Sequence, residues 1–187
     1  MLGDDITVKS EWELIKRDKI LDTQYLKVYN DEVRLPNGNI ISDFSLTKKA
    51  DVVIIVATDK KKRVIVVEEY KHGAGEVQLT VPGGIIDEGE TDIDAAKREL
   101  REETGFEGKN FRRLGVIYED PSKEMRKISV FRAEEVEKSS EQNLDYSETI
   151  VKVSLFSIDE INKQVKRGLW KASSSIASLS LAGLLNQ

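Results

Sequence analysis

Residues 84–106 read GIIDEGETDIDAAKRELREETGF, and this stretch decides the fold of the chain. Within it, Glu99, Glu102 and Glu103 place three carboxylates in five consecutive positions. On a helix these side chains would point the same way, because residues three and four apart share a face. Mg²⁺ is usually held by one or two carboxylates together with substrate phosphates, so the spacing indicates a cation site. The alternative is an acidic helix face that simply meets water.

The helix itself is predicted by the residues around those glutamates. Thr91 is a good N-cap with Asp94 three positions later, and Gly105 is suited to end the helix in a left-handed conformation. We expect Arg98 to reach back to Glu90 in the preceding loop, and the acidic face to be offered to solvent or to a ligand. An apolar stripe at helical spacing is expected to pack on another face, and it consists of Ile93, Ala96 and Leu100.

At every fixed position the stretch resembles the signature of the Nudix hydrolases, G-x5-E-x7-R-E-U-x-E-E-x-G-U, where U is a bulky apolar residue. Leu100 and Phe106 occupy the two U positions. The resemblance implies an α/β (α+β) fold, the Nudix αβα sandwich with a mixed sheet. It also implies hydrolysis of a nucleoside diphosphate linked to another group, with Mg²⁺ or Mn²⁺ on the pyrophosphate and a carboxylate accepting a proton from water.

The resemblance further implies which residues hold the metal. Glu99 and Glu103 would be direct ligands, together with the backbone carbonyl of Gly83. Glu102 would be a ligand or lie one water away. The motif glycines would let the loop and the helix end turn tightly.

Four more motif positions would support the metal ligands. Gly84 would allow a tight loop beside the helix, and Gly105 would end the helix. Arg98 and Glu90 would orient the metal-binding glutamates. A simple surface ion pair is the alternative for Arg98 and Glu90.

The catalytic base is placed by resemblance in the loop that follows the motif helix. In relatives it is often a glutamate after a proline, which corresponds to Glu124 here, with Glu119 and Asp120 as nearby competitors. A surface glutamate without a catalytic role is the alternative. By the same resemblance, Glu99 and Glu102 are counted as catalytic alongside Glu124.

Residues outside the motif bear on the substrate. Residues 69–72 read EYKH, similar to the QYRH stretch of ADP-ribose pyrophosphatases, and Pro121 lies sixteen residues after Gly105, where that subfamily carries a proline. This resemblance implies ADP-ribose as the substrate, with AMP and ribose 5-phosphate as products. Tyr70, Lys71 and Pro121 would then contact the substrate. His72, the single histidine, is expected to have a structural or phosphate-proximal role.

Several positions depart from the subfamily and leave the substrate open. Lys71 stands where relatives usually carry arginine, and lysine meets phosphate as a point charge instead of a planar fork. Thr80 replaces a common glutamate, Gly83 replaces a common alanine, and the loop after Tyr118 reads EDPSKE. GDP-mannose or another nucleoside diphosphate derivative stays possible as the substrate. Two other functions also stay possible for the chain. One is a non-catalytic Nudix-fold nucleotide-binding module, and the other is a house-cleaning hydrolase of nucleoside triphosphates.

Composition narrows the cellular setting. The chain has 187 residues and a net charge of −5, and the stretch 87–107 alone holds nine acidic and three basic residues. A nucleic-acid binder would be expected to show a basic patch, and no apolar run is long enough to cross a bilayer. The absence of cysteine fits the cytoplasm. From composition we therefore expect a cytoplasmic protein with no nucleic-acid or membrane partner. The small nucleotide sugar expected as substrate is what the resemblance implies.

The chain is expected to divide into an N-terminal β segment, residues 1–47, and the Nudix hydrolase domain, residues 48–187. In relatives the N-terminal segment swaps across a homodimer, so the resemblance implies a homodimer with a shared pocket. Trp12 would then stack on the substrate base, or else pack in the core or interface. Asn37-Gly38 is typical of a hairpin turn.

The remaining elements are read from hydrophobic patterns. Residues 52–57 form an apolar run that predicts a strand buried on both faces, and residues 134–148 are polar and expected to form an exposed loop. Further strands are expected at residues 12–20, 24–35, 40–46, 64–67, 78–81, 114–118, 127–136 and 151–156, and further helices at 159–167 and 173–185.

Overall fold

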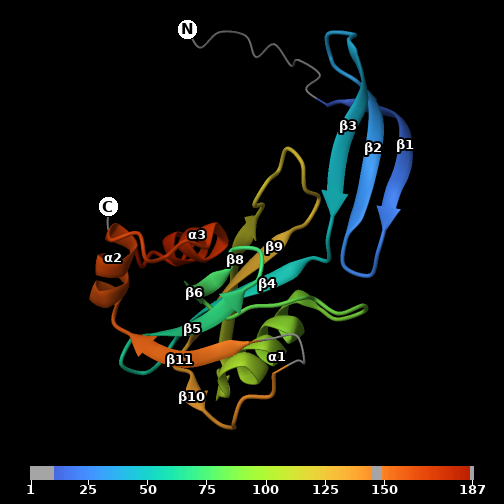
Figure 1. Cartoon of the computed structure of the whole chain (residues 1–187). Helices are drawn as coiled ribbons and strands as arrows, with labels where there is room; N and C mark the ends of the chain where they lie inside the picture. Colours follow the sequence, from blue (N-terminus) through green and yellow to red (C-terminus); the bar gives the residue numbers. More distant parts are fainter. Residues whose placement is uncertain (1–10, 145–148, 186–187) are drawn as a thin grey trace, which may run out of the picture. The chain divides into compact units, whose positions relative to one another are not determined.

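The computed structural model describes residues 11–144 and 149–185. These residues fall into two compact units, each with its own sheet (Figure 1). Among the described residues, the smaller unit comprises 11–50 and the later segment Asp120–Arg126, and the larger unit comprises the others.

The smaller unit is a three-stranded antiparallel sheet in the order β1-β2-β3. The hairpin predicted at Asn37-Gly38 is confirmed, since Gly38 has φ +88° and its N–H donates to Leu35 O at 2.9 Å. The later segment joins β3 through Thr47, whose N–H donates to Lys123 O at 2.8 Å. The strands are β1 (Glu13–Asp22), β2 (Lys27–Arg34) and β3 (Ile40–Lys48).

The larger unit is built on a mixed six-stranded sheet with the path β11-β5-β4-β9-β8, and β6 pairs with β5. Only β4 and β9 are parallel among these pairs, and a separate two-stranded ladder joins β7 and β10. Its elements are β4 (Val52–Thr58), β5 (Val64–Lys71), β6 (Glu76–Thr80), α1 (Asp92–Thr104), β7 (Phe106–Glu107), β8 (Asn110–Ile117), β9 (Ile128–Glu134), β10 (Glu137–Lys138), β11 (Ile150–Phe156), α2 (Ile158–Lys166) and α3 (Ser173–Leu181).

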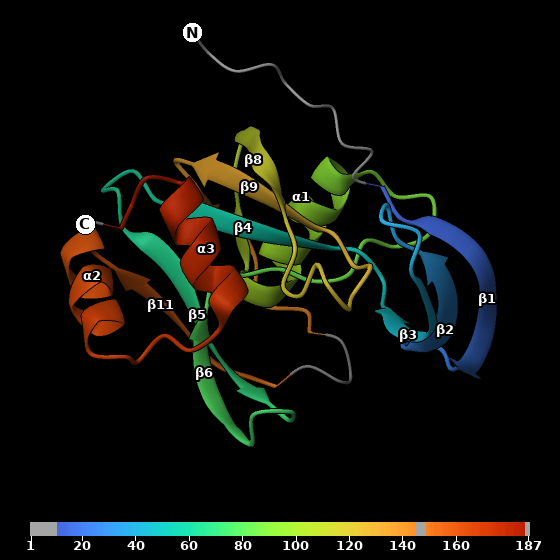
Figure 2. The same ribbon diagram turned by 90° about the horizontal axis from the view of Figure 1, so that it is seen from above.

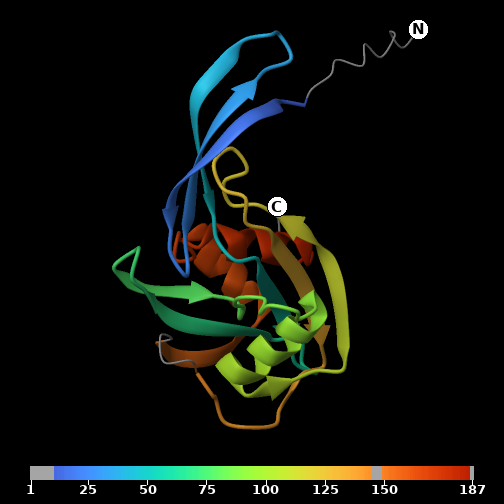
Figure 3. The same ribbon diagram turned by 90° about the vertical axis from the view of Figure 1, so that its right-hand side faces the viewer.

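Helices cover both faces of this sheet (Figures 1 and 3). On one face, Leu100 of α1 is fully buried in a cluster with Ile55 of β4. On the other face, Leu179 of α3 is buried with Val56 of β4, and Figure 2 shows α3 in front of β4 and β5. Strand β4 is therefore buried on both sides, as its continuous apolar run predicts. The αβα layering and the mixed sheet are confirmed.

Two local expectations differ from the structure. Helical spacing predicts Ile93 in the buried stripe of the motif helix, but Ile93 is 38% exposed, while Ala95 is fully buried in its place. Ala95 and Ala96, both fully buried, therefore form the part of the first helix turn that packs on the sheet. The polar stretch 134–148 is not wholly a loop, because Glu137–Lys138 pairs with Phe106–Glu107; residues 145–148 lie outside the described residues.

Among the described residues, no helix has the length and apolar character needed to cross a membrane.

The turn between β4 and β5 is closed by Asp59, which is 8% exposed. Its carboxylate accepts hydrogen bonds from the N–H groups of Lys61 and Arg63 at 2.9 and 2.8 Å, and the Arg63 guanidinium donates to it at 2.6 and 2.8 Å. Burial by itself raises the pKa of Asp59, but the hydrogen bonds from Arg63 and Lys61 together outweigh it and hold the pKa below its usual value.

We expect Asp59→Asn to lower the free energy of unfolding by about 1–3 kcal/mol near neutral pH, because the donors on Lys61 and Arg63 lose a buried, charged acceptor. A depressed folded-state pKa contributes stability above the unfolded pKa, and that contribution is lost as pH falls through the folded pKa. The difference from wild type should therefore shrink below about pH 4. Denaturant titrations at neutral and acidic pH measure this difference in the free energy of unfolding. Asp43→Asn, at an exposed position, is the control. A difference that does not change with pH would contradict the charge-based explanation.

Candidate active site

The motif helix begins and ends as its sequence predicts. Thr91 is the N-cap, with its hydroxyl accepting from Asp94 N at 3.3 Å and donating to the Asp94 carboxylate at 2.6 Å. Gly105 is the C-cap at φ +72°, and its N–H donates to Arg101 O at 2.7 Å. The two caps set the first and last residues of α1, so all three motif glutamates lie within the helix.

The acidic face of α1 is not solvated. Glu99 is 6% exposed and Glu103 is 3% exposed, whereas the Glu102 side chain is 26% exposed. Ionised carboxylates are costly to bury unless they are paired or coordinate a metal. The burial of two motif glutamates therefore excludes an acidic face that simply meets water.

The loop before α1 is held to the sheet by residues on either side of Gly83. Ile55 N donates to Pro82 O at 2.8 Å, and Val53 N donates to Gly84 O at 2.9 Å. In an extended segment, backbone groups point alternately to two sides, so those of Gly83 face away from β4. The Gly83 N–H donates to Glu103 Oε2 at 2.9 Å, so the loop contacts the acidic face of α1 at this residue.

Both loop glycines are required by close approach. A Cβ on Gly84 would lie 2.4 Å from the Glu99 carboxylate, and a Cβ on Gly83 would lie 2.3 Å from Val53 O. The carboxylates of Glu99 and Glu103 thus lie against two consecutive glycines.

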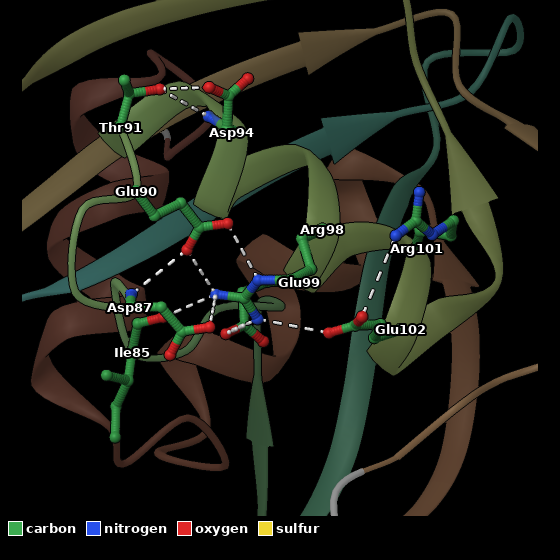
Figure 4. Close-up of polar contacts among 9 residues, drawn as sticks. All are labelled: Ile85, Asp87, Glu90, Thr91, Asp94, Arg98, Glu99, Arg101 and Glu102. Carbon is green, nitrogen blue, oxygen red and sulfur yellow. Dashed lines mark hydrogen bonds and ion pairs between the residues drawn. The ribbon is translucent and has the colours of Figure 1, made fainter.

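Arg98 links the motif glutamates to the loop (Figure 4). Its Nε and Nη2 donate to the two carboxylate oxygens of Glu90 at 3.0 and 2.8 Å, and Nη2 also donates to Ile85 O at 2.8 Å. Its Nη1 donates to Glu99 at 2.8 Å and to Glu102 at 3.2 Å. A planar guanidinium satisfies several acceptors at fixed angles, so Arg98 orients both glutamates.

The charges of this network shift two pKa values. The hydrogen bond to Glu90 is the largest effect on Arg98 and raises the pKa of its guanidinium, with Glu99 and Glu102 acting in the same direction. The hydrogen bonds from Arg98 lower the pKa of Glu90. Both groups are therefore charged near neutral pH, and the Arg98–Glu90 pair is more than a surface contact because the two side chains are 23% and 18% exposed.

We expect Arg98→Lys to lower activity by about 10–100-fold, because lysine keeps the charge but loses the fork that orients Glu99 and Glu102. The free energy of unfolding should fall by only about 1–2 kcal/mol, since the pair keeps partial solvent contact. Turnover and denaturant unfolding measure the two effects. Arg101→Lys is the matched control on the same helix, because the Arg101 side chain is 50% exposed and its Nη2 lies 3.9 Å from Glu102 Oε1. Equal activity of both variants would contradict an orienting role.

The donor chemistry of the site fits a hard divalent cation. The two buried carboxylates of Glu99 and Glu103 and the carbonyl of the adjacent Gly83 would offer oxygen ligands, which Mg²⁺ and Mn²⁺ prefer. Among the described residues, no three His, Cys, Asp or Glu side chains are grouped as a ready-made metal site. Glu99 and Glu102 are instead bridged by the guanidinium of Arg98. A cation bound by Glu99, Glu103 and the Gly83 carbonyl would therefore take its remaining ligands from substrate or water.

Strand β5, which precedes the motif in the chain, carries two residues predicted to contact the substrate, Tyr70 and Lys71. Alternation places Lys71 on the face that Ile65 presents to α1, and Tyr70 on the opposite face, where its ring lies 6.3 Å from that of His72. The Lys71 ammonium is 2.6 Å from Glu69, which is 8% exposed. Lys71 therefore already has a carboxylate partner, a contact that the EYKH pattern does not predict.

The candidate base Glu124 lies in the smaller unit. Its Oε1 is 3.3 Å from Lys49 Nζ and 3.1 Å from Arg126 Nε. Asp120 accepts a hydrogen bond from Ser122 N at 3.2 Å within the same segment. Glu124 is thus held by two cations, and its assignment as the base stays a prediction.

Trp12 and Pro121 also lie in the smaller unit. Trp12 is 46% exposed and makes an edge contact with Phe44, with ring centroids 5.2 Å apart. Pro121 is exposed in a turn. The structure brings together, in the larger unit, Gly83, Gly84, Glu90, Arg98, Glu99, Glu102, Glu103 and Gly105.

Comparisons with known proteins define the class of this fold and site. A model of the NUDIX domain matches residues 48–177. The ADP-ribose pyrophosphatase of Bacillus subtilis (strain 168) is 28% identical over 126 residues, 67% of this chain and 68% of that protein. The ADP-ribose pyrophosphatase of Mycobacterium tuberculosis (strain ATCC 25618 / H37Rv) is 30% identical over 105 residues, 56% and 50% of the two chains.

A crystal structure of an ADP compounds hydrolase has the same fold, with a TM-score of 0.78 at 19% identity over 92% of each chain. The chain belongs to the Nudix hydrolases and is an enzyme of that family, similar to its ADP-ribose pyrophosphatases. Nudix hydrolases act on small nucleotide substrates and generally use divalent metal ions.

Proposed function

We propose that this enzyme hydrolyses the pyrophosphate bond of a nucleoside diphosphate sugar, and that ADP-ribose is cleaved to AMP and ribose 5-phosphate with Mg²⁺ or Mn²⁺. The observation that carries the proposal is the burial of Glu99 and Glu103 against the glycine loop, with Arg98 bracing Glu99. The choice of ADP-ribose is supported by the names of the two pyrophosphatase relatives.

Each residue of the site has a proposed part in the reaction. Glu99, Glu103 and the Gly83 carbonyl would hold the cation, and Glu102 would bind it directly or through water. When bound, the cation neutralises charge on the phosphates and orients them. A water oxygen bonds to one phosphorus as the P–O bond to the bridging oxygen breaks, and that oxygen leaves with the other phosphate, giving the two monophosphate products. A carboxylate accepts the water proton. Glu124 is the proposed acceptor of that proton.

The substrate side of the proposal rests on residues outside the motif. Lys71 would exchange its Glu69 partner for a phosphate oxygen, a contact that lysine makes as a point charge. Tyr70, Pro121 and Trp12 would contact the nucleotide, and Trp12 is exposed enough to stack on a base. The enzyme is proposed to act in the cytoplasm as a homodimer, without a nucleic-acid or membrane partner.

A substrate panel tests the proposal. Purified full-length chain with Mg²⁺ is incubated with ADP-ribose, GDP-mannose, NADH and oxidised nucleoside triphosphates, and mononucleotide release is followed by chromatography. We expect the highest kcat/KM for ADP-ribose. Preference for GDP-mannose would keep the reaction and replace the substrate. A lack of product from every compound would support a nucleotide-binding module instead of an enzyme of this specificity.

The homodimer is tested by light scattering after size-exclusion chromatography. A mass of two chains is the expected result. A monomer at working concentration would remove the shared pocket, and with it the stacking role proposed for Trp12.

A further inference from the structure

The C-terminal end of α1 is completed by a distant loop. An α-helix leaves its last carbonyl groups without partners inside the helix. In α1, Arg101 O accepts from Gly105 N at 2.7 Å, so the helix cap itself satisfies that carbonyl. Glu102 O accepts instead from Asn143 N at 2.9 Å, and Glu103 O accepts from Gln142 Nε2 at 2.6 Å. The turn that carries two motif glutamates is therefore tied to residues 139–143, which we call the cap loop.

The cap loop also approaches the motif glycine very closely. Ser139 N and Ser140 N donate to Gly105 O at 2.9 and 3.2 Å. A Cβ on Gly105 would lie 2.3 Å from Ser140 O, in addition to the strain of its φ of +72°. The last motif glycine is thus required by contact with the cap loop as well as by its left-handed conformation.

Glu103 is consequently held at two points. Its carboxylate accepts from Gly83 N at 2.9 Å, and its backbone carbonyl accepts from the Gln142 side chain at 2.6 Å. The Gln142 amide places a donor at the negative end of the helix dipole, which is a favourable position. Four hydrogen bonds described above join the cap loop to the end of α1, and three of them are donated by backbone N–H groups. The fourth is donated by the Gln142 side chain, so a substitution at residue 142 can remove it alone.

We propose that Gln142 is a positioning residue for Glu103, and that the cap loop sets the geometry of the cation-binding turn from outside the motif. The inference rests on the proposed function, because it assigns to Glu103 the role of a metal ligand. Gln142 does not touch substrate or metal; it acts through the backbone of Glu103. Loss of its hydrogen bond lets the last turn of α1 loosen and weakens cation binding.

The test compares three variants of the full-length chain. Gln142→Ala removes the donor, and Gln142→Lys supplies an ammonium donor to the same helix-end carbonyl. Asn143→Ala is the matched control, because residue 143 contacts Glu102 through its backbone N–H. Binding of Mn²⁺ alone is measured by electron paramagnetic resonance, kcat and KM are measured for ADP-ribose, and thermal unfolding is followed.

We expect Gln142→Ala to weaken Mn²⁺ binding about tenfold, as loss of an outer-shell partner does, with KM for the nucleotide unchanged at saturating metal. Gln142→Lys and Asn143→Ala should bind Mn²⁺ as wild type does. Unchanged Mn²⁺ affinity in Gln142→Ala, or a weakened affinity that Gln142→Lys does not restore, would overturn the proposal. Wild-type chain that binds Mn²⁺ but cleaves no substrate would contradict the proposed function while the binding comparison still decides the role of Gln142.

Discussion

Glu103→Gln is expected to lower turnover of the preferred nucleoside diphosphate sugar by about a thousandfold. A metal-bound carboxylate supports several kcal/mol of charge stabilisation in the transition state, and each 1.36 kcal/mol corresponds to about tenfold in rate. The fold should be retained, because the amide oxygen of glutamine can still accept the hydrogen bond that Gly83 N donates to Glu103. Steady-state kinetics at saturating Mg²⁺, with circular dichroism of both proteins, measure the effect.

The matched control for this substitution is Glu88→Gln. Glu88 is exposed in the loop before α1 and occupies a variable position of the motif. It should retain wild-type turnover and metal dependence. Near-wild-type turnover of Glu103→Gln, in contrast, would remove Glu103 from the metal site.

Gly83→Ala is expected to lower the free energy of unfolding by about 3 kcal/mol, at the upper end of what overpacking costs. Its Cβ would lie 2.3 Å from Val53 O and 2.9 Å from Ile54 Cα, which are backbone atoms of the central strand β4. Backbone in the middle of a sheet cannot rotate away, so the loop must leave its hydrogen bonds to β4. Denaturant unfolding measures the loss.

Gly84→Ala should behave differently, although the two glycines are adjacent. Its Cβ would meet the carboxylate of Glu99 at 2.4 Å, the far end of a side chain that can rotate. We therefore expect a small loss of stability and a large loss of activity as Glu99 is displaced. Gly115→Ala is the control for both, because no atom lies within 4 Å of a Cβ there. Equal stability of Gly83→Ala and Gly115→Ala would contradict the close approach to β4.

Local chemistry explains the parts of the site that sequence could predict. Thr91 and Gly105 cap α1 where their conformational preferences place them, and Arg98 reaches Glu90 because a helix turn and a short loop bring them together. The same is true of β4, whose unbroken apolar run predicts burial on both faces. These features depend on residues close together in the chain.

The parts that could not be predicted depend on long-range contacts. Burial of Glu99 and Glu103 follows from the pairing of the glycine loop with β4, which no local pattern indicates. Polar residues 139–143 predict an exposed loop, and their reach to the end of α1 appears only in the fold. The Glu69–Lys71 ion pair is another example, because the EYKH pattern predicts a substrate contact and not an internal partner.

Metal-dependent release of AMP from ADP-ribose is the most direct test that the glutamates of α1 form the active site. The full-length chain is treated with chelator, Mg²⁺ is then returned, and AMP is quantified for wild type and Glu103→Gln. The predicted result is no AMP with chelator, full release from wild type when Mg²⁺ is returned, and almost none from the variant. Equal AMP release with and without Mg²⁺, or equal release from both proteins, would contradict a metal site at Glu103.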